Sequence, residues 1–251
     1  MTTVSIDARR LAVLLGGVCF ALAASATDVG HVSLLIGEAR VVRADGTPEV
    51  LQRGAQIRVG DRIETSANGH VHMRFVDNAA VSVRPDSSLE VQAYRFDVLR
   101  PESNEVKFRV EKGTSRSISG AATDLDKSRF RLNTPIAAIG VRGTDFIVQT
   151  DPTGVRATVS DGAIVVGALG AGCSAAGLGP CSGAQVRELS ADMGRLMAEV
   201  RPNDQATRIL PAADLSVATA ASRIERSDAA RPLSPSAAHA IGLAAAEPTP
   251  G

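Results

Sequence analysis

The chain has 251 residues with 27 basic and 27 acidic side chains, and the charges are interspersed rather than gathered in a Lys/Arg run. This pattern argues against a nucleic-acid footprint and against a polybasic membrane patch. Tyr94 is the only tyrosine and tryptophan is absent, which argues against a sugar-binding site built on exposed aromatic faces.

Residues 1–26 have the three regions of a secretory leader. Arg9 and Arg10 give a positive start, residues 11–22 are apolar, and residues 24–26 form an A-x-A cleavage site. An uncleaved anchor is the alternative, but the apolar run is shorter than the ~20 residues that cross a bilayer. We therefore expect a cleaved signal peptide, export to an oxidising compartment, and no stable membrane span after cleavage.

A period of two dominates from Val32 to Leu189, with turn residues cutting the chain every 8 to 16 positions. Asp45-Gly46 predicts a hairpin between two short apolar pairs. Alternation predicts half-buried strands, including one in which Ala93 faces the apolar side and Tyr94 the polar side. The strands expected from alternation are 71–75, 81–83, 89–94, 106–111 and 155–159. Many short strands separated by turn residues predict an all-β fold.

The run from 134 to 146 is the most distinctive segment. It contains no Ser/His/Asp, Cys/His or paired-carboxylate group, so it predicts a structural corner rather than a catalytic site, and the chain leaves it as a central strand at 146–148. We assign a structural or partner-binding role to nine residues of this motif, which are Thr134, Pro135, Gly140, Val141, Arg142, Gly143, Thr144, Asp145 and Phe146.

Arg142 is the charged residue at the centre of this run. We expect an inward side chain tied to backbone carbonyls or to a carboxylate such as Asp145 or Asp161, because a buried charge needs a partner. Capture of an anionic ligand by its planar fork is the alternative. Gly140 and Gly143 are then positions where the backbone bends or another segment approaches closely.

Two histidines, His70 and His72, lie two positions apart on the polar face of one strand. Two imidazoles could share a metal, but a structural zinc site takes four ligands and no third ligand is evident. We therefore expect exposed strand histidines, no metal, no cofactor and no enzymatic activity. An envelope enzyme acting on glycans or peptides is the remaining alternative, although no nucleophile and base pair supports it.

Residues 167–183 form a Gly/Ala-rich loop that contains Cys173 and Cys181. An oxidising compartment favours a disulfide between them, with two free thiols as the alternative. Residues 186–189 predict a returning strand. Beyond residue 190 the composition changes: we expect a short helix at 192–200, another candidate helix at 212–226, and disorder from Ser227 onward.

Five segments together resemble the FecR domain, which is named after the bacterial iron-citrate uptake regulator. They are Gly54–Thr65 with its Gly60-Asp61 step, Phe75–Asn78, Pro85–Leu89, the run from Thr134 to Phe146, and Asp161-Gly162. The resemblance covers roughly residues 33–166. It implies a periplasmic, non-enzymatic β domain with a β-helix-like or sandwich-like arrangement.

Together with the leader and the change in composition, the resemblance divides the chain into a signal peptide (1–26), a FecR-like domain (27–190, with core 33–166 and loop 167–183) and a tail (191–251) with a short helix and a disordered end. Iron-uptake regulators of this family carry a sigma-factor-binding segment before a membrane span, and the ten residues before the apolar run here are too few for one. We expect an exported bacterial binding or scaffold module that is periplasmic, secreted or in the cell envelope, and whose partner is a protein or envelope component. The alternative is an envelope sensor that relays a signal to a membrane or sigma-factor regulatory partner.

Overall fold

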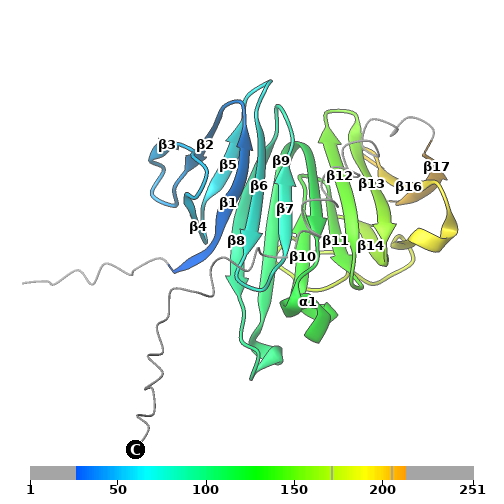
Figure 1. Ribbon diagram of the computed structural model, residues 1–251. Helices are drawn as coiled ribbons and strands as arrows, with labels where there is room; N and C mark the ends of the chain where they lie inside the picture. The colour runs from blue at the N-terminus through cyan, green and yellow to red at the C-terminus, as the bar shows by residue number, and fades with distance from the viewer. Residues whose placement is uncertain (1–26, 171, 205, 213–251) are drawn as a thin grey trace, which may run out of the picture.

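The computed structural model describes residues 27–170, 172–204 and 206–212. The expected leader and the expected disordered tail lie outside these residues, as does nearly all of the candidate helix at 212–226. Within the described part, most residues are in strands, so the predicted all-β class is confirmed. The strands form two twisted layers, sheet A and sheet B (Figure 1).

Each sheet has nine strands among the described residues, and β9 contributes to both. Sheet A has, in spatial order, β4 (Gln56–Arg58), β1 (Asp28–Ile36), β6 (His70–Phe75), β7 (Ala80–Val83), β9 (Glu105–Ile118), β12 (Asp145–Asp151), β13 (Gly154–Asp161), β16 (Leu196–Val200) and β17 (Arg208–Pro211). Sheet B has β3 (Pro48–Val50), β2 (Ala39–Val42), β5 (Arg62–Thr65), β8 (Ser88–Arg95), β9, β10 (Phe130–Asn133), β11 (Ala137–Val141), β14 (Ala163–Ala168) and β15 (Arg187–Ser190).

Helical segments are short and lie in the connections. They are η1 (Pro101–Ser103), α1 (Ala121–Leu125), η2 (Lys127–Arg129) and η3 (Ala191–Met193). The chain passes repeatedly from one sheet to the other, and neighbouring strands are antiparallel except for β9 with β10. The two layers correspond to the sandwich-like alternative that the resemblance implied.

Strand β9 joins the two sheets. Up to Lys112 it pairs with β8 and β10 in sheet B, and from Gly113 to Ile118 it pairs with β7 and β12 in sheet A. The sequence predicts only its first half, because apolar alternation stops at Val110. The second half continues as Ser115, Arg116 and Ser117, a polar run that is nevertheless buried.

The core lies between the sheets and is made by the inward residues of each strand. Aromatic rings connect the layers: Phe75 of sheet A stacks on Tyr94 of sheet B at 4.5 Å and meets Phe108 edge-on at 5.3 Å. Further along, Phe130 and Phe146 make the same kind of contact at 6.0 Å. Such ring pairs add to the stability that area burial gives.

The predicted orientation of Tyr94 is wrong. A bulge between Val91 and Ala93 shifts the register of β8 against β9, and an extra residue in one strand reverses the faces that follow it. Tyr94 therefore points into the core instead of Ala93. Its hydroxyl donates to the buried carboxylate of Asp77, and burial, followed by that neighbouring charge, raises the pKa of Tyr94, so it stays a donor.

The expected short helix at 192–200 is also wrong. Only η3 forms, and Leu196–Val200 is strand β16, which pairs with β13 through Val155 and Val200. The exposed edge of β13 offers backbone donors and acceptors that a strand satisfies and a helix cannot. Strand β17 then pairs with β16, so the folded region continues to Pro211, beyond the boundary expected at residue 190.

Candidate functional site

The central motif forms the corner between β11 of sheet B and β12 of sheet A (Figure 1). Arg142, Gly143 and Thr144 make the turn, and Gly143 has φ +73°, a conformation that glycine adopts without strain. The Thr144 amide donates to Ser119 Oγ at 3.1 Å, and the Ser119 amide donates to the Thr144 carbonyl at 2.9 Å. The corner is thereby attached to the chain just beyond β9.

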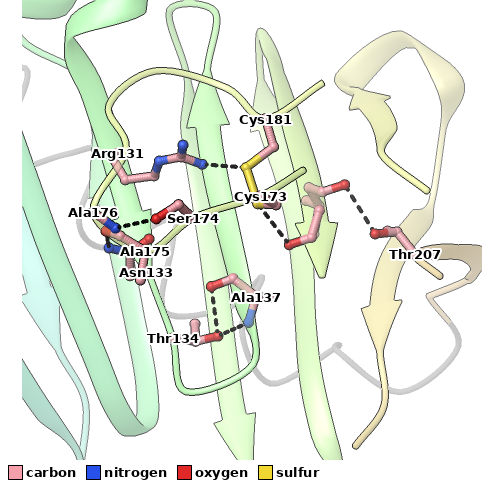
Figure 2. Close-up of a disulfide and its surroundings, with 12 residues drawn as sticks. Arg131, Asn133, Thr134, Ala137, Cys173, Ser174, Ala175, Ala176, Cys181 and Thr207 are labelled. Carbon is pink, nitrogen blue, oxygen red and sulfur yellow. Dashed lines mark hydrogen bonds between the residues drawn. A yellow bond between two sulfur atoms is a disulfide. The ribbon is translucent and has the colours of Figure 1, made fainter. Parts of the chain in front are cut away.

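Thr134 and Pro135 make the turn that precedes β11. The amide of Thr134 donates to the Ala137 carbonyl at 2.8 Å. The Thr134 hydroxyl also donates to that carbonyl at 3.1 Å, and the amide of Ala137 donates to Thr134 Oγ1 at 2.9 Å (Figure 2). Thr134 is buried and Pro135 is exposed. Val141 and Phe146 point into the core on the two sides of the corner, so these motif residues hold backbone and core in place.

The charged residues of the motif do not behave as expected. The side chain of Arg142 is 57% exposed and lies 3.6 Å from Glu188 at the surface. The buried partner of Asp145 is Arg116 of β9, which donates from Nε at 2.7 Å and from Nη2 at 2.6 Å. The prediction of a buried Arg142 is therefore wrong: it lies at the tip of a turn, and β9 supplies the buried cation instead.

The outer face of sheet B has two different halves. Its covered half consists of β10, β11 and β14, beneath residues 172–183, which we call the cystine loop. The Cys173–Cys181 disulfide expected from the sequence is present, with Cα atoms 5.3 Å apart. Asn133 Nδ2 donates to the Ala175 carbonyl at 2.9 Å, which attaches the loop to β10 (Figure 2).

Glycine at position 140 is required by this cover. A Cβ atom on Gly140 would lie 2.5 Å from the Cα atom of Pro180 in the cystine loop. Contacts this short do not occur between carbon atoms, so any larger residue must displace the loop. The sequence predicted that another segment approaches Gly140 closely, and the structure shows that this segment is the cystine loop.

The open half of the same face consists of β2, β5, β8 and the first part of β9. A groove of about 900 Å³ lies across its end. Six charged side chains of both signs line it, together with small polar residues and Val50 of β3; the charged ones are Glu38, Arg40, Arg62, Glu64, Glu111 and Lys112. The groove could not be predicted from the sequence, because it depends on which strands lie side by side.

The carboxylate of Glu64 organises this groove. Arg40 lies 2.6 Å from it on β2, and Arg62 lies 3.0 Å from it on its own strand. Burial raises the pKa of Glu64, but the hydrogen bonds from Arg40 and Arg62 outweigh that effect and hold the pKa below its usual value. Two cations share one carboxylate, so the arginines keep donors for a further acceptor.

Neither a metal-binding cluster nor a membrane-spanning helix is found in the part of the chain that the structure describes. His70 and His72 lie together on β6 with ring centroids 4.5 Å apart, but no group of three or more His, Cys, Asp or Glu side chains could hold a metal ion there. Among the same residues no helix has the length and apolar character needed to cross a membrane.

Solved structures with some likeness to this chain are known. One described as "Cell surface anchoring domain" is 31% identical with a TM-score of 0.25, over 26% of this chain and 84% of that chain. Two structures described as a "putative anti-sigma factor" from Parabacteroides distasonis ATCC 8503 are 13% and 14% identical, each with a TM-score of 0.44. This chain spans 64% and 62% of their lengths.

No curated protein matches the chain. The family model described as FecR protein matches residues 61–165, from the turn before β5 to strand β14. That range lies inside the 33–166 expected from the sequence, and it contains the 134–146 corner and the strands of the open half from β5 to β9. Residues 61–165 therefore form a FecR domain.

Proposed function

We propose that the chain is an exported, non-catalytic FecR-domain module that binds a protein partner in the cell envelope through the open half of sheet B. The groove of about 900 Å³ carries this proposal. It is a concave surface on a rigid sheet with charges of both signs, and such surfaces give an interface its register and its partner choice.

The chemistry of the groove favours a polypeptide over a small anion. Three acidic and three basic side chains line it, so the ligand that satisfies them carries both signs at spaced positions, as a peptide segment does. The ion pairs of Arg40 and Arg62 with Glu64 hold these side chains in one arrangement before binding. Preorganisation of this kind reduces the entropy that association costs.

A photo-crosslinker at Lys112, used in the native cells, tests the proposal. We expect one specific adduct that Arg40→Glu combined with Arg62→Glu abolishes. A crosslinker at Arg187, on the edge strand β15 and outside the groove, serves as the positional control and should not give that adduct. Equal capture from both positions, or an adduct that survives the double charge reversal, contradicts the assignment of the groove.

The location is a separate part of the proposal. The mature chain should begin at Thr27 after cleavage of residues 1–26, which intact-mass measurement of the exported protein checks. A product that keeps its leader and fractionates with membranes supports the second hypothesis, a sensor that relays an envelope signal to a regulatory partner. The crosslinked adduct then distinguishes the two, because a sensor requires a membrane-embedded partner.

A further inference from the structure

A buried guanidinium lies against the disulfide. Arg131 projects from β10 towards the cystine loop, is 3% exposed, and donates from Nη1 to Cys181 Sγ at 2.9 Å (Figure 2). Its Nε is buried with no hydrogen-bond partner in the described part of the chain. Burial lowers the pKa of Arg131, and no neighbouring carboxylate acts in the opposite direction. The arginine stays charged.

This arrangement is costly while the sulfurs are joined. A buried cation without a counter-charge destabilises a fold, and a disulfide sulfur is a neutral, weak acceptor. Arg116, the other buried arginine considered above, has the carboxylate of Asp145 at 2.6 Å. Arg131 lacks such an anion among the described residues, but reduction of the disulfide would create one at the sulfur that it already contacts.

We propose that the Cys173–Cys181 disulfide is redox-active and that, after reduction, Cys181 is a thiolate paired with Arg131. A positive neighbour lowers the pKa of a cysteine thiol. A disulfide whose reduced form is stabilised is more readily reduced than an ordinary structural one. This proposal is independent of the groove on the open half.

The reaction is exchange with a protein dithiol. Cys181 is half-buried and Cys173 is buried, so the reductant's thiolate attacks Cys181 Sγ, and Cys173 leaves and takes a proton. The second reductant thiolate attacks the reductant's own sulfur in the mixed disulfide and releases Cys181 as a thiolate. Two electrons pass to the chain, the reductant becomes a disulfide, and Arg131 stabilises the leaving sulfur of the second step.

Other charged groups near the loop have other partners. Lys107 of β9 donates to the Ala176 carbonyl at 3.1 Å, and Arg129 of η2 pairs with Asp126. On β15, Arg187 donates to backbone carbonyls at 2.8 and 2.9 Å, and Glu188 lies beside Arg142. Arg131 is therefore the charged side chain positioned to act on Cys181 Sγ.

Alkylation of the reduced full chain by iodoacetamide across pH 5 to 10 tests the thiolate directly. We expect Cys181 to react with an apparent pKa at least one unit below the ordinary ~8.5 of cysteine, and at least tenfold faster than Cys173 at pH 6.5. Mass mapping of the two peptides separates their rates. An ordinary pKa at Cys181 overturns the proposal without any variant.

Equilibration with glutathione redox buffers tests the reducibility. Arg131→Met should make the disulfide at least tenfold harder to reduce, a shift of about 30 mV for two electrons, and Arg131→Lys should restore part of the difference. Lys107→Met is the matched control, because Lys107 contacts the same loop at a backbone carbonyl, and it should leave the equilibrium unchanged. Equal effects of Arg131→Met and Lys107→Met would show that the arginine only holds the loop.

Discussion

The two halves of the outer face of sheet B share one sheet and one core but differ in what lies over them. On the covered half the outward residues include Arg131, Asn133 and Gly140, all buried beneath the cystine loop. On the open half they include Arg40 and Glu64, which form ion pairs at the surface. The difference shows that the burial of an outward side chain depends on whether another segment lies over the sheet, whereas an inward side chain is buried by the core in either half.

The largest effect is expected from a change in β9, the strand that belongs to both sheets. Arg116→Ala leaves the carboxylate of Asp145 buried without its bidentate partner, and loss of one member of a buried pair costs about 3 to 5 kcal/mol. Urea unfolding of the purified chain measures the effect. Arg142→Ala is the matched control: this arginine is exposed, so its change should stay within about 0.5 kcal/mol. A comparable loss from Arg142→Ala would restore the role that the sequence assigned to it.

Removing the disulfide tests how much it contributes to the stability of the covered half. The loop that it closes is short, with a sequence separation of 8, and restriction of the unfolded chain predicts a loss of about 2 to 3 kcal/mol for Cys173→Ser with Cys181→Ser. Calorimetry of the double variant and of the reduced parent gives both values. The reduced parent should lose less, because only it can form a thiolate beside Arg131. An equal loss would argue against that ion pair.

Adding a side chain at position 140 tests whether the cystine loop packs against β11. Gly140→Val should displace Pro180 and cost about 1 to 3 kcal/mol, as overpacking does. Proteolysis within the cystine loop should become faster. Glu90→Val places the same side chain at a half-exposed, outward position of the open half, and should alter stability by about 0.5 kcal/mol or less. If Gly140→Val is equally silent, the loop does not pack on β11 in solution.

The smallest effect belongs to the ion pairs of the open half. Arg40→Ala should cost at most about 1 kcal/mol, because the Arg40 side chain of this pair is 63% exposed. The pKa of Glu64 is lowered in the folded state, so the pair contributes fully above the unfolded pKa of ~4.3 and its contribution falls as the pH drops below that value. The difference between parent and variant in urea midpoint should therefore be smaller at pH 3.5 than at pH 7. If the difference in urea midpoint instead grows towards low pH, the pair does not stabilise the ionised form of Glu64.

The sequence predicted those parts of the fold that depend on alternation along one strand. His70–Phe75 has its apolar residues inward as expected, and the hairpin around Asp45-Gly46 joins β2 and β3. The bulge at Val91 was not predictable, because it inverts the faces without changing the composition. Residues 196–200 alternate only weakly, and the free edge of β13 decides that they form a strand.

The candidate sites were less predictable than the strands. The disulfide could be predicted because its two cysteines lie in one loop. Arg116 and Arg131 gave no signal, because each looks like an ordinary polar position of a strand, and only the packing of distant segments buries them. The groove likewise joins residues from 38 to 112, so no local pattern could have shown it.

Strand β9 has a further consequence for how the protein unfolds. Its first half completes sheet B and its second half completes sheet A, so neither layer can lose it without exposing the core of the other. The parts of the chain before and after β9 therefore do not form separate folding units, although they follow one another in the sequence. Cooperativity of this kind means that a partner bound in the groove would stabilise the covered half as well, through mass action on a single folded state.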